Sequence, residues 1–341
     1  MDKVKVVFFD VKEHEKEYIE RNKPENCEFV LLPDNFHCDL EKDLQVAGDA
    51  DIISVFTTSR VRKDFLKEFK NLKLISTRST GYSHIDTNYC KERNIPVVNV
   101  PRYGDSTVAE FAFGLLLEIA RNISTAYNDL RRGVISPQSY IGIDLFEKTI
   151  GIIGTGAIGT HAAKIAKGFG MNILAYDPYP KKELEQSIGL KYVTLDELYE
   201  KADIITLHAP ATKENFHMIN EAAFNKMKNG VIIINTARGE IIDTEALYKA
   251  LKSGKVAGAG LDVLECEEIL GNEDQYIPKI DCIDPQCLTK TLINHRMLDM
   301  PNVVITPHVA YDSHEALQRI LDTTFNNIKA FLNNEVINRV N

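Results

Sequence analysis

The sequence predicts an α/β protein with two doubly wound lobes, each built on a parallel sheet between layers of helices. Three observations carry this prediction. The chain has 341 residues, more than the roughly 100–200 that one domain usually holds. Short runs of Val, Ile, Leu and Phe alternate with amphipathic stretches, as expected for strands buried on both faces of a parallel sheet. A glycine-rich stretch at residues 154–159 opens a second such array in mid-chain.

The first array begins the chain. Its apolar runs are predicted to be strands and its amphipathic stretches helices. The strands are expected at residues 4–11, 29–33, 51–56, 72–76 and 96–100. The helices are expected at residues 12–21, 61–69 and 86–93. The front lobe is therefore predicted to be a parallel α/β unit without a glycine fingerprint.

A proline-containing stretch at residues 101–106 interrupts the alternation. Thr107-Val108-Ala109-Glu110 follows it and matches a capping box, in which both polar side chains bond backbone N–H groups at a helix start. An apolar helix is therefore predicted at residues 111–120, and the border between the lobes is expected just before it.

The alternation resumes at residue 148 in the second array. Six strands are predicted there, the count of a full dinucleotide-binding sheet. They are expected at residues 149–153, 173–177, 204–208, 231–235, 257–263 and 303–306. Helices between them are expected at residues 162–166, 196–201, 221–228 and 244–253.

The end of the chain, residues 313–335, has the pattern of one long amphipathic helix. We expect it to fold back onto the front lobe, which makes that lobe discontinuous: residues 1–102 with 310–341, and an inserted lobe of residues 103–309. Residues 265–300 do not fit the alternation, and connections beyond about 12–15 residues usually carry function or structure of their own. A short helix is predicted inside this segment at residues 288–298.

Charge and hydropathy exclude several classes of function. The net charge is −9, from 49 acidic and 40 basic residues, which gives no electrostatic footprint for nucleic acid or for an anionic membrane surface. The apolar run at residues 111–117 is far shorter than the ~20 residues that span a bilayer. The amino terminus lacks the long apolar region and the cleavage site of a signal peptide. We therefore expect a cytoplasmic protein.

Six cysteines, at positions 27, 38, 90, 266, 282 and 287, are scattered along the chain. Without a secretory signal, reduced thiols are expected rather than a disulfide framework. Cys266, Cys282, Cys287 and His295 offer an alternative interpretation as zinc ligands, but no C-x-x-C pair is present, so no metal is expected.

The glycine-rich stretch is Gly154-Thr155-Gly156-Ala157-Ile158-Gly159. It follows a predicted strand and precedes a helical pattern, the context that a dinucleotide fingerprint requires. Gly154 would make the tight turn, Gly156 would let backbone approach a pyrophosphate, and Gly159 would let the helix pack closely on the strand. Glycines also gather in ordinary turns, so the context carries the assignment.

Asp177 ends the second strand of the array, 18 residues after Gly159. An acidic residue at this place bonds the adenosine ribose hydroxyls and repels a 2′-phosphate, which favours NAD over NADP. Lys181 and Lys182 soften that discrimination. The alternative interpretation is a solvated loop aspartate before Pro178.

Polar residues gather where later strands of the array end. Arg238 follows one strand, Asp262 ends the next with Glu267 just beyond, and His308 ends the last. Considered singly, Arg238 could be a surface arginine and Glu267 part of an acidic run. His308 could be a core histidine whose hydrogen bonds are made within the protein. The carboxyl ends of parallel strands share one edge of a sheet, however, so these side chains are expected beside a bound nicotinamide.

Together the three match one chemical requirement. Hydride transfer to a 2-keto acid needs a cation for the substrate carboxylate and a proton donor for the carbonyl oxygen. Arg238 can pair bidentately with the carboxylate. His308 can donate the proton, and Glu267 beside it would orient the ring and raise its pKa.

The chain here resembles the D-isomer-specific 2-hydroxyacid dehydrogenase family over essentially its full length. Four motifs in order carry the resemblance: the glycine fingerprint, Asn235-Thr236-Ala237-Arg238-Gly239, Gly260-Leu261-Asp262-Val263-Leu264-Glu265-Cys266-Glu267, and Thr306-Pro307-His308. The resemblance implies a Rossmann NAD-binding domain inserted into a flavodoxin-like substrate domain. It implies NAD as cofactor, with the active site in the cleft between the two.

The resemblance also implies roles for single residues. Arg238, Glu267 and His308 become the catalytic trio. Arg78-Ser79-Thr80-Gly81 is similar to the family loop that holds the substrate carboxylate, so Thr80 and Gly81 are expected substrate contacts. NAD contacts are implied for Gly154, Gly156, Ala157, Ile158, Gly159, Asp177, Ala209, Pro210, Asn215, Thr236, Ala237 and Asp262.

Within the family, Val100-Pro101-Arg102-Tyr103 resembles the D-lactate dehydrogenase subgroup, whose tyrosine closes over the substrate side chain. Pyruvate reduction to D-lactate is therefore the expected activity. Glyoxylate or hydroxypyruvate reduction stays open, and so does D-2-hydroxyacid oxidation on branched-chain substrates. A different class of function also stays open, a non-catalytic NAD-sensing protein similar to the corepressors that resemble this family.

The helix at residues 107–121 is longer and more uniformly apolar than one sheet face requires. The corresponding region of the family forms a dimer contact. A homodimer through this helix is therefore expected.

Overall fold

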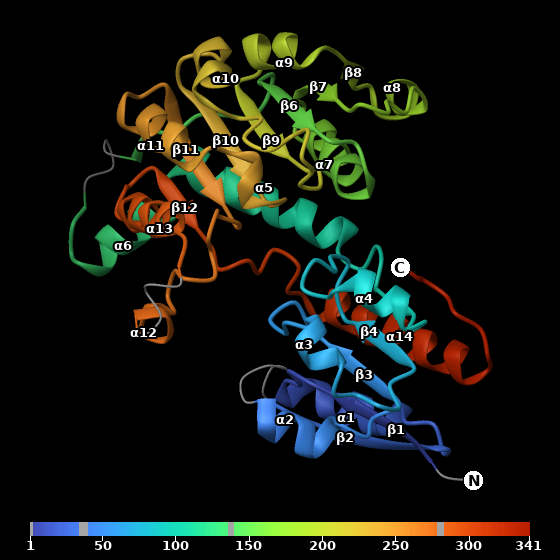
Figure 1. Ribbon diagram of the computed structural model, residues 1–341. Helices are drawn as coiled ribbons and strands as arrows, with labels where there is room; N and C mark the ends of the chain where they lie inside the picture. The colour runs from blue at the N-terminus through green and yellow to red at the C-terminus, as the bar shows by residue number, and fades with distance from the viewer. Residues whose placement is uncertain (1–2, 34–39, 136–139, 278–282) are drawn as a thin grey trace. The chain divides into compact units, whose positions relative to one another are not determined.

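A computed structural model describes residues 3–33, 40–135, 140–277 and 283–341. The protein divides into two compact units, each with its own sheet and core (Figure 1). The smaller unit comprises Met1–Tyr103 and Ser313–Asn341, and the larger comprises Gly104–Asp312. Among the described residues, no helix has the length and hydropathy needed to cross a membrane.

The smaller unit contains a parallel sheet of five strands. They are β1 (Val4–Phe8), β2 (Cys27–Leu31), β3 (Ile52–Val55), β4 (Leu74–Thr77) and β5 (Val97–Val98). Their spatial order is β2-β1-β3-β4-β5, the flavodoxin-like order. The five predicted strands are thus confirmed, with ends that differ by up to three residues.

Helices cover both faces of this sheet because β1 points apolar side chains to both sides. Val6 and Phe8 face α1 (Glu13–Asn22) and α14 (His314–Leu332), where Phe325 packs on Phe8. Val7 and Phe9 face the layer that holds α2 (Leu40–Ala47), α3 (Lys63–Leu66) and α4 (Thr87–Glu92). The sequence patterns predicted α1, α3, α4 and α14 but missed α2.

The larger unit begins with two consecutive helices, α5 (Asp105–Arg121) and α6 (Ile123–Arg131). The predicted capping box is wrong: the N-cap of α5 is Gly104, three residues before Thr107, and Thr107 lies inside the first turn of the helix. Asn122 separates the two helices in a left-handed conformation with φ of 52°. No sequence pattern predicted α6.

The sheet of the larger unit has seven parallel strands. They are β6 (Thr149–Ile153), β7 (Asn172–Tyr176), β8 (Lys191–Tyr192), β9 (Ile204–Leu207), β10 (Val231–Asn235), β11 (Val256–Leu261) and β12 (Val303–Ile305). Six of them were predicted, and the two-residue β8 is too short to leave a hydrophobic pattern. The order β12-β11-β10-β9-β6-β7-β8 is the dinucleotide-binding order with one further strand, β12, at its edge.

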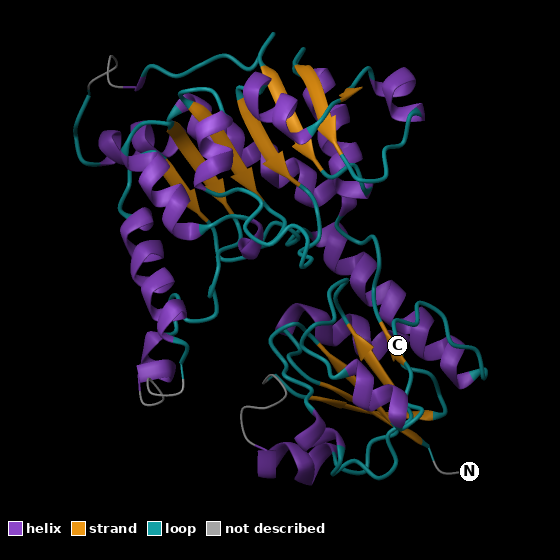
Figure 2. Cartoon of the chain, turned by 45° about the horizontal axis from the view of Figure 1, so that its top comes forward, coloured by secondary structure: helices purple, strands orange, loops and turns teal. Residues whose placement is uncertain are grey.

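Two layers of helices enclose this sheet (Figure 2). One layer contains α5, α7 (Ala157–Gly168) and α8 (Glu183–Ile188). The other contains α9 (Leu195–Lys201), α10 (Glu221–Lys226), α11 (Thr244–Lys252) and α13 (Pro285–Leu298). The central strands β6, β9, β10 and β11 are almost wholly buried, as their unbroken apolar runs predicted, whereas β7, β8 and β12 are partly exposed.

Between β11 and β12 the chain leaves the alternation, as expected. It forms α12 (Glu273–Tyr276) and then α13, whose amino terminus is capped by the side chain of Asp284. The predicted helix at residues 288–298 is confirmed and begins three residues earlier, at Pro285. A proline at this position suits the first turn of a helix, whose N–H groups have no partner within the helix.

Candidate active site

The candidate site lies along the carboxyl ends of the strands in the larger unit. Neighbouring strands pair in parallel, so β6, β9, β10, β11 and β12 all end at the same edge. The strand order reverses between β6 and β9, because β7 and β8 lie to one side of β6 and the later strands to the other. Ligands of open α/β sheets bind outside the strand ends at such a point.

The three glycines after β6 have different surroundings. Gly154 has φ of +92°, and a Cβ there would lie 2.7 Å from the carbonyl oxygen of His208. A Cβ on Gly159 would lie 1.9 Å from the carbonyl oxygen of Gly154, so only glycine lets α7 start this close to β6. A Cβ on Gly156 would meet no protein atom within 4 Å. Gly156 therefore faces open space at the start of α7, and this cradle fits a pyrophosphate.

Asp177 lies beside this loop, directly after β7. Its Oδ2 accepts hydrogen bonds from the backbone N of Thr155 at 2.6 Å and from Thr155 Oγ1 at 2.9 Å. Its Oδ1 accepts one from the backbone N of Tyr179 at 2.8 Å. The carboxylate thus ties the end of β7 to the glycine loop, next to the space expected to hold the adenosine ribose.

Ala209, Pro210 and Asn215 belong to the loop that follows β9. Asn215 closes this loop, since its Nδ2 donates to the carbonyl oxygen of Pro210 at 2.7 Å and its Oδ1 accepts from the N of Thr212 at 2.7 Å. A cavity of about 550 Å³ opens beside the loop, lined by Ala211, Thr212, Lys213, Phe216 and Glu240. Its lining does not include the three residues predicted to be catalytic.

The loop after β10 carries Thr236, Ala237 and Arg238. Asn235 shapes it: Oδ1 accepts from the N of Ala237 at 3.0 Å, and Nδ2 donates to the carbonyl oxygen of Arg238 at 2.9 Å. Arg238 is exposed, and its Nη1 donates to the carbonyl oxygen of Ala237 at 2.6 Å. Thr236 Oγ1 is buried and has no hydrogen-bond partner within the described residues, as expected beside a polar ligand.

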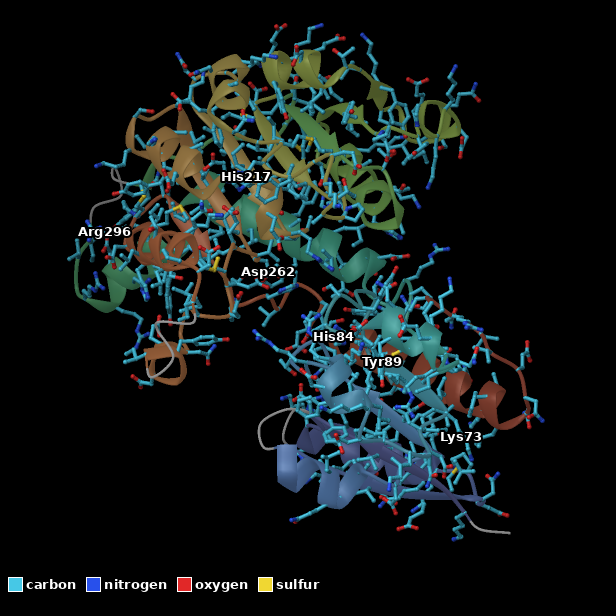
Figure 3. The ribbon with its side chains drawn as sticks, viewed as in Figure 1. Lys73, His84, Tyr89, His217, Asp262 and Arg296 are labelled. Atoms are coloured by element: carbon cyan, nitrogen blue, oxygen red, sulfur yellow. A yellow bond between two sulfur atoms is a disulfide. The ribbon has the colours of Figure 1, made fainter. Side chains whose placement is uncertain are left out.

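Asp262 fixes the turn that carries His308. Its Oδ1 accepts hydrogen bonds from Thr306 Oγ1 at 2.6 Å and from the N of Val309 at 2.9 Å, and its Oδ2 accepts one from the N of Ala310 at 2.9 Å. Burial raises the pKa of Asp262, although these hydrogen bonds favour the charged form. Asp262 lies at the edge of the sheet where the strands end (Figure 3). Its carboxylate therefore holds β12's terminal loop against β11.

His308 and Glu267 meet at this edge. Nδ1 of His308 lies 2.7 Å from Oε1 of Glu267, and Oε2 of Glu267 accepts a hydrogen bond from the N of Leu264 at 3.1 Å. Burial lowers the pKa of His308, but the hydrogen bond and charge of Glu267, with the charge of Asp262, raise it above its ordinary value. The charge of Arg238 acts in the opposite direction. The site therefore brings a cation and an imidazole–carboxylate pair together.

The predicted substrate-binding residues of the smaller unit form a tightly bonded loop after β4. Thr80 Oγ1 donates to the carbonyl oxygen of Val100 at 2.9 Å, and Ser79 Oγ donates to the carbonyl oxygen of Gly81 at 2.6 Å. Arg78 is buried and donates to the carbonyl oxygens of Phe9 and Asp10, both at 2.8 Å. These bonds hold the loop at the strand ends of this sheet.

Tyr103, the other predicted substrate contact, is the last residue of the first segment of the smaller unit. Its carbonyl oxygen accepts a hydrogen bond from Nε of Arg319, on α14, at 2.7 Å. The residue is thereby tied to the carboxyl-terminal helix of the same unit.

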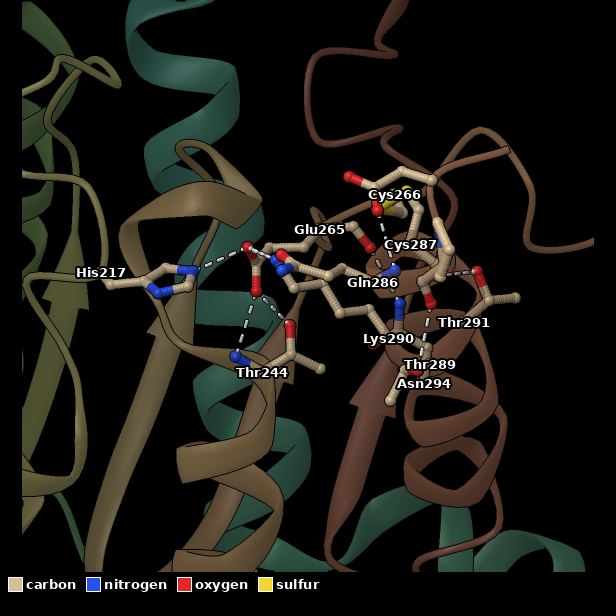
Figure 4. Close-up of a disulfide and its surroundings, with 12 residues drawn as sticks. His217, Thr244, Glu265, Cys266, Gln286, Cys287, Thr289, Lys290, Thr291 and Asn294 are labelled. Carbon is tan, nitrogen blue, oxygen red and sulfur yellow. Dashed lines mark hydrogen bonds and ion pairs between the residues drawn. A yellow bond between two sulfur atoms is a disulfide. The ribbon is translucent and has the colours of Figure 1, made fainter. Parts of the chain in front are cut away.

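Sequence reasoning missed a buried polar cluster around Glu265. Its carboxylate binds His217 Nε2 at 2.8 Å, Lys290 Nζ at 2.6 Å and Thr244 Oγ1 at 2.7 Å (Figure 4). Burial acts to raise the pKa of Glu265, but these partners outweigh it and lower the pKa. The sequence placed Glu265 in an acidic run, and nothing in that run distinguishes a buried carboxylate from a solvated one.

The expectation of reduced thiols is wrong for two of the cysteines. Cys266 and Cys287 form a disulfide, with their Cα atoms 5.6 Å apart. Spacing alone could not predict it, because α13 brings a residue 21 positions away to the segment that follows β11. The alternative interpretation as zinc ligands fails with it, since disulfide sulfurs are not thiolates. Cys38 and Cys282 lie outside the described residues.

Comparisons with known proteins agree with this geometry. Residues 113–310 match the family model described as D-isomer specific 2-hydroxyacid dehydrogenase, NAD binding domain. The chain is 36% identical over 327 residues to D-lactate dehydrogenase of Escherichia coli (strain K12), which covers 95% of this chain and 96% of that protein. It is 40% identical over 283 residues to hydroxypyruvate reductase of Thermotoga maritima, covering 82% and 85%.

One similar solved structure covers nearly the whole chain. It is D-lactate dehydrogenase from Aquifex aeolicus complexed with NAD and lactic acid, with a TM-score of 0.84 and 35% identity, covering 97% of this chain and 96% of that one. The family match lies entirely within the larger unit, where the glycine cradle lies. The chain therefore belongs to the D-isomer specific 2-hydroxyacid dehydrogenase family and is an NAD-dependent 2-hydroxyacid dehydrogenase.

Proposed function

We propose that this dehydrogenase reduces pyruvate to D-lactate, with Arg238 binding the substrate carboxylate and His308 acting as acid and base. The observation that carries the proposal is the 2.7 Å contact between His308 Nδ1 and Glu267 Oε1, close enough to Arg238 for its charge to act on the ring. Reduction of a 2-keto acid requires a proton donor for the carbonyl oxygen and a cation for the substrate carboxylate. His308, with Glu267 beside its ring, can donate the proton, and Arg238 can supply the cation.

Each side chain has one task. The exposed guanidinium of Arg238 pairs with the substrate carboxylate, which orients the neighbouring carbonyl. Oε1 of Glu267 accepts a hydrogen bond from Nδ1–H of His308, so that in the protonated ring Nε2–H donates the proton that passes to the carbonyl oxygen. Bound NADH would supply the hydride. In the oxidative direction neutral His308 accepts the hydroxyl proton at Nε2.

The cofactor assignments follow the same edge of the sheet. Gly154, Gly156, Ala157, Ile158 and Gly159 would hold the pyrophosphate, and Asp177 would bind the adenosine ribose. Ala209, Pro210, Asn215, Thr236, Ala237 and Asp262 lie on the later strand ends and would contact the rest of the dinucleotide. The open space at Gly156 and the unpartnered hydroxyl of Thr236 within the described residues support these roles.

The group attached to the keto carbon distinguishes pyruvate from the alternative substrates, which are glyoxylate, hydroxypyruvate and branched-chain 2-keto acids. We assign Thr80, Gly81 and Tyr103 to the substrate, with the tyrosine against this group. The relatives include a D-lactate dehydrogenase and a hydroxypyruvate reductase, which share the reaction and differ in this part of the substrate. Pyruvate comes first because the resemblance around Tyr103 is to the D-lactate dehydrogenase subgroup.

The test is NADH oxidation with pyruvate, glyoxylate, hydroxypyruvate and 2-ketoisocaproate, followed by chiral analysis of the product. We expect the highest kcat/KM with pyruvate and D-lactate as product. His308→Ala should lower kcat by about 10²–10⁴-fold, the scale of general acid catalysis, and leave NADH affinity nearly intact. No oxidation with any keto acid would contradict the proposal, and NADH binding without turnover would favour a non-catalytic NAD-sensing protein.

We also propose that the protein is a homodimer that uses the region of α5 and α6. Much of α5 is buried within its own unit, but Ile123, Tyr127 and Leu130 of α6 are exposed apolar residues on one helix. Exposed apolar patches of this kind mark contact surfaces. Light scattering should give twice the chain mass, and Tyr127→Lys with Leu130→Lys should give the mass of one chain. A monomeric wild-type protein would end this proposal.

A further inference from the structure

We propose that Cys266 and Cys287 are a redox-active pair, whose oxidation by a low-molecular-weight disulfide fixes the position of Glu267 and raises turnover. The inference rests on the proposed function, because Glu267 is assigned there as the partner of His308. It adds a modification site to the site described above.

The pair lies beside the acid/base residues. Cys266 directly precedes Glu267 in the chain, and its disulfide joins it to Cys287 in the first turn of α13 (Figure 4). In the next residue, Oε1 of Glu267 lies 2.7 Å from Nδ1 of His308. A covalent bond between the carboxylate's neighbour and a helix therefore limits how far that carboxylate can move from the imidazole.

The backbone of Cys266 is in an uncommon conformation. Its φ of 57° lies in the left-handed region, which residues other than glycine rarely adopt unless the surrounding structure holds them there. The link to α13 is such a restraint. Once it opens, Cys266 can return to a common backbone conformation, and this rotation redirects the side chain of the next residue, Glu267.

The residue on the other side stays in place. Lys290 Nζ binds the carboxylate of Glu265 at 2.6 Å, and Asn294 Nδ2 donates to its carbonyl oxygen at 3.0 Å. Positions 287, 290 and 294 share one face of α13, since their spacing is three and four residues. His217 and Thr244 hold Glu265 from other elements. Reduction therefore removes a covalent restraint on residues 266 and 267, while these bonds keep Glu265 in place.

The chemistry is ordinary thiol–disulfide exchange. The thiolate of one cysteine attacks a sulfur of the small disulfide, forms a mixed disulfide and releases one thiol. The second cysteine then displaces the other thiol. The protein pair loses two electrons and two protons, and the reagent gains them as two thiols. Cys266 and Cys287 are both partly exposed, whereas Cys27 and Cys90 are buried, so the reagent can reach this pair.

The first experiment measures the modification without reference to activity. The full-length protein is equilibrated with mixtures of reduced and oxidised glutathione, and the free thiols are mapped by alkylation and peptide mass spectrometry. We expect Cys266 and Cys287 to convert together between free and linked forms. If the two cysteines remain free in oxidised glutathione, or if they form disulfides with other cysteines, the proposal is overturned.

The second experiment compares turnover of the two forms. We expect kcat for keto acid reduction to be about fivefold lower in the reduced form, equal to about 1 kcal/mol, with a smaller change in KM. The fall of activity with rising pH should also begin at lower pH, because Glu267 holds His308 less firmly. The charges of Asp262 and Arg238 also act on His308, and neither residue belongs to the disulfide, so both groups are present in both forms.

Matched variants separate this coupling from a purely structural role. Cys266→Ser and Cys287→Ser should behave as the reduced wild type in every glutathione mixture. A Cys38→Ser, Cys282→Ser variant keeps the pair and should keep the response. Thermal unfolding of both forms checks that the protein stays folded.

The outcomes are distinct. Conversion of the pair with the same kcat and pH profile in both forms refutes the coupling and leaves the proposed function standing. No turnover in either form with any keto acid refutes the proposed function and, with it, this inference.

Discussion

His308 and Glu267 show how two residues 41 positions apart become one reactive unit. The ring is held by its contact with Glu267, and its backbone N donates to the carbonyl oxygen of Asp262 at 2.9 Å. Its φ of 55° turns the chain sharply after β12 and directs the residue back toward β11. The pKa of the ring is raised because two carboxylates outweigh burial and the charge of Arg238.

Glu267→Gln tests the electrostatic part of this arrangement. The amide carries no charge, so the pKa of His308 should fall, and protonated His308 should be lost at lower pH than in the wild type. Keto acid reduction should therefore decline at lower pH, with kcat at pH 8 lowered by up to about 10²-fold. Glu268→Gln is the matched control, because Glu268 is exposed and the same charge is removed. An unchanged pH profile in Glu267→Gln would contradict the role of its charge.

Asp177→Ala tests the choice of cofactor. Removing the carboxylate should abolish repulsion of a 2′-phosphate and raise kcat/KM with NADPH relative to NADH. The ratio is the proper measure, because Asp177 also binds Thr155 and its loss will loosen the glycine loop for both cofactors. If the ratio stays the same, Asp177 does not lie at the ribose.

Among the elements, the start of α7 has the strictest requirement. It begins at the fingerprint because Gly159 alone lets the helix approach the end of β6, while Gly156 leaves space in front of the helix. The other site residues of this unit are placed by the strands that they follow. Parallel strands bring Arg238, Asp262 and His308 to one edge, although the described part of the chain between Arg238 and His308 includes three α-helices, α11, α12 and α13, and two further strands, β11 and β12.

Gly156→Ala should bind NADH about tenfold more weakly, since the new methyl group occupies the space expected for the pyrophosphate. The free protein should keep its stability, because a Cβ there meets no protein atom within 4 Å. Gly168→Ala, at the other end of α7 and equally unobstructed, should bind NADH normally and gain about 0.4–1 kcal/mol of stability, because alanine restricts the unfolded chain. Equal NADH affinity in both variants, measured by fluorescence titration, would place the pyrophosphate elsewhere.

The whole molecule has two cores, and we expect them to unfold separately. NADH should protect only the larger unit, because the glycine cradle lies there. At 100 times its Kd, a ligand adds about 2.7 kcal/mol, which should raise the Tm of this unit by roughly 5–10 °C. Scanning calorimetry with and without NADH should show one transition that moves and one that does not. Equal shifts of both transitions would contradict this expectation.

Most of the fold could be predicted because buried parallel strands leave unbroken apolar runs. Among the residues that the structure describes, that signal found eleven of the twelve strands and failed for β8, whose two residues are too few. It also failed for α2 and α6, whose patterns are short or interrupted. The start of α5 was wrong because Thr107 and Glu110 match a capping box that the backbone does not use.

The sequence by itself determined the strand–helix alternation, the glycine fingerprint and the residue types at the strand ends, because these are local or follow from parallel pairing. Only the tertiary structure decided that Glu265 is buried with Lys290, His217 and Thr244, and that Cys266 meets Cys287. Contacts of this kind depend on where α13 packs after a long excursion of the chain, and no local pattern specifies that position.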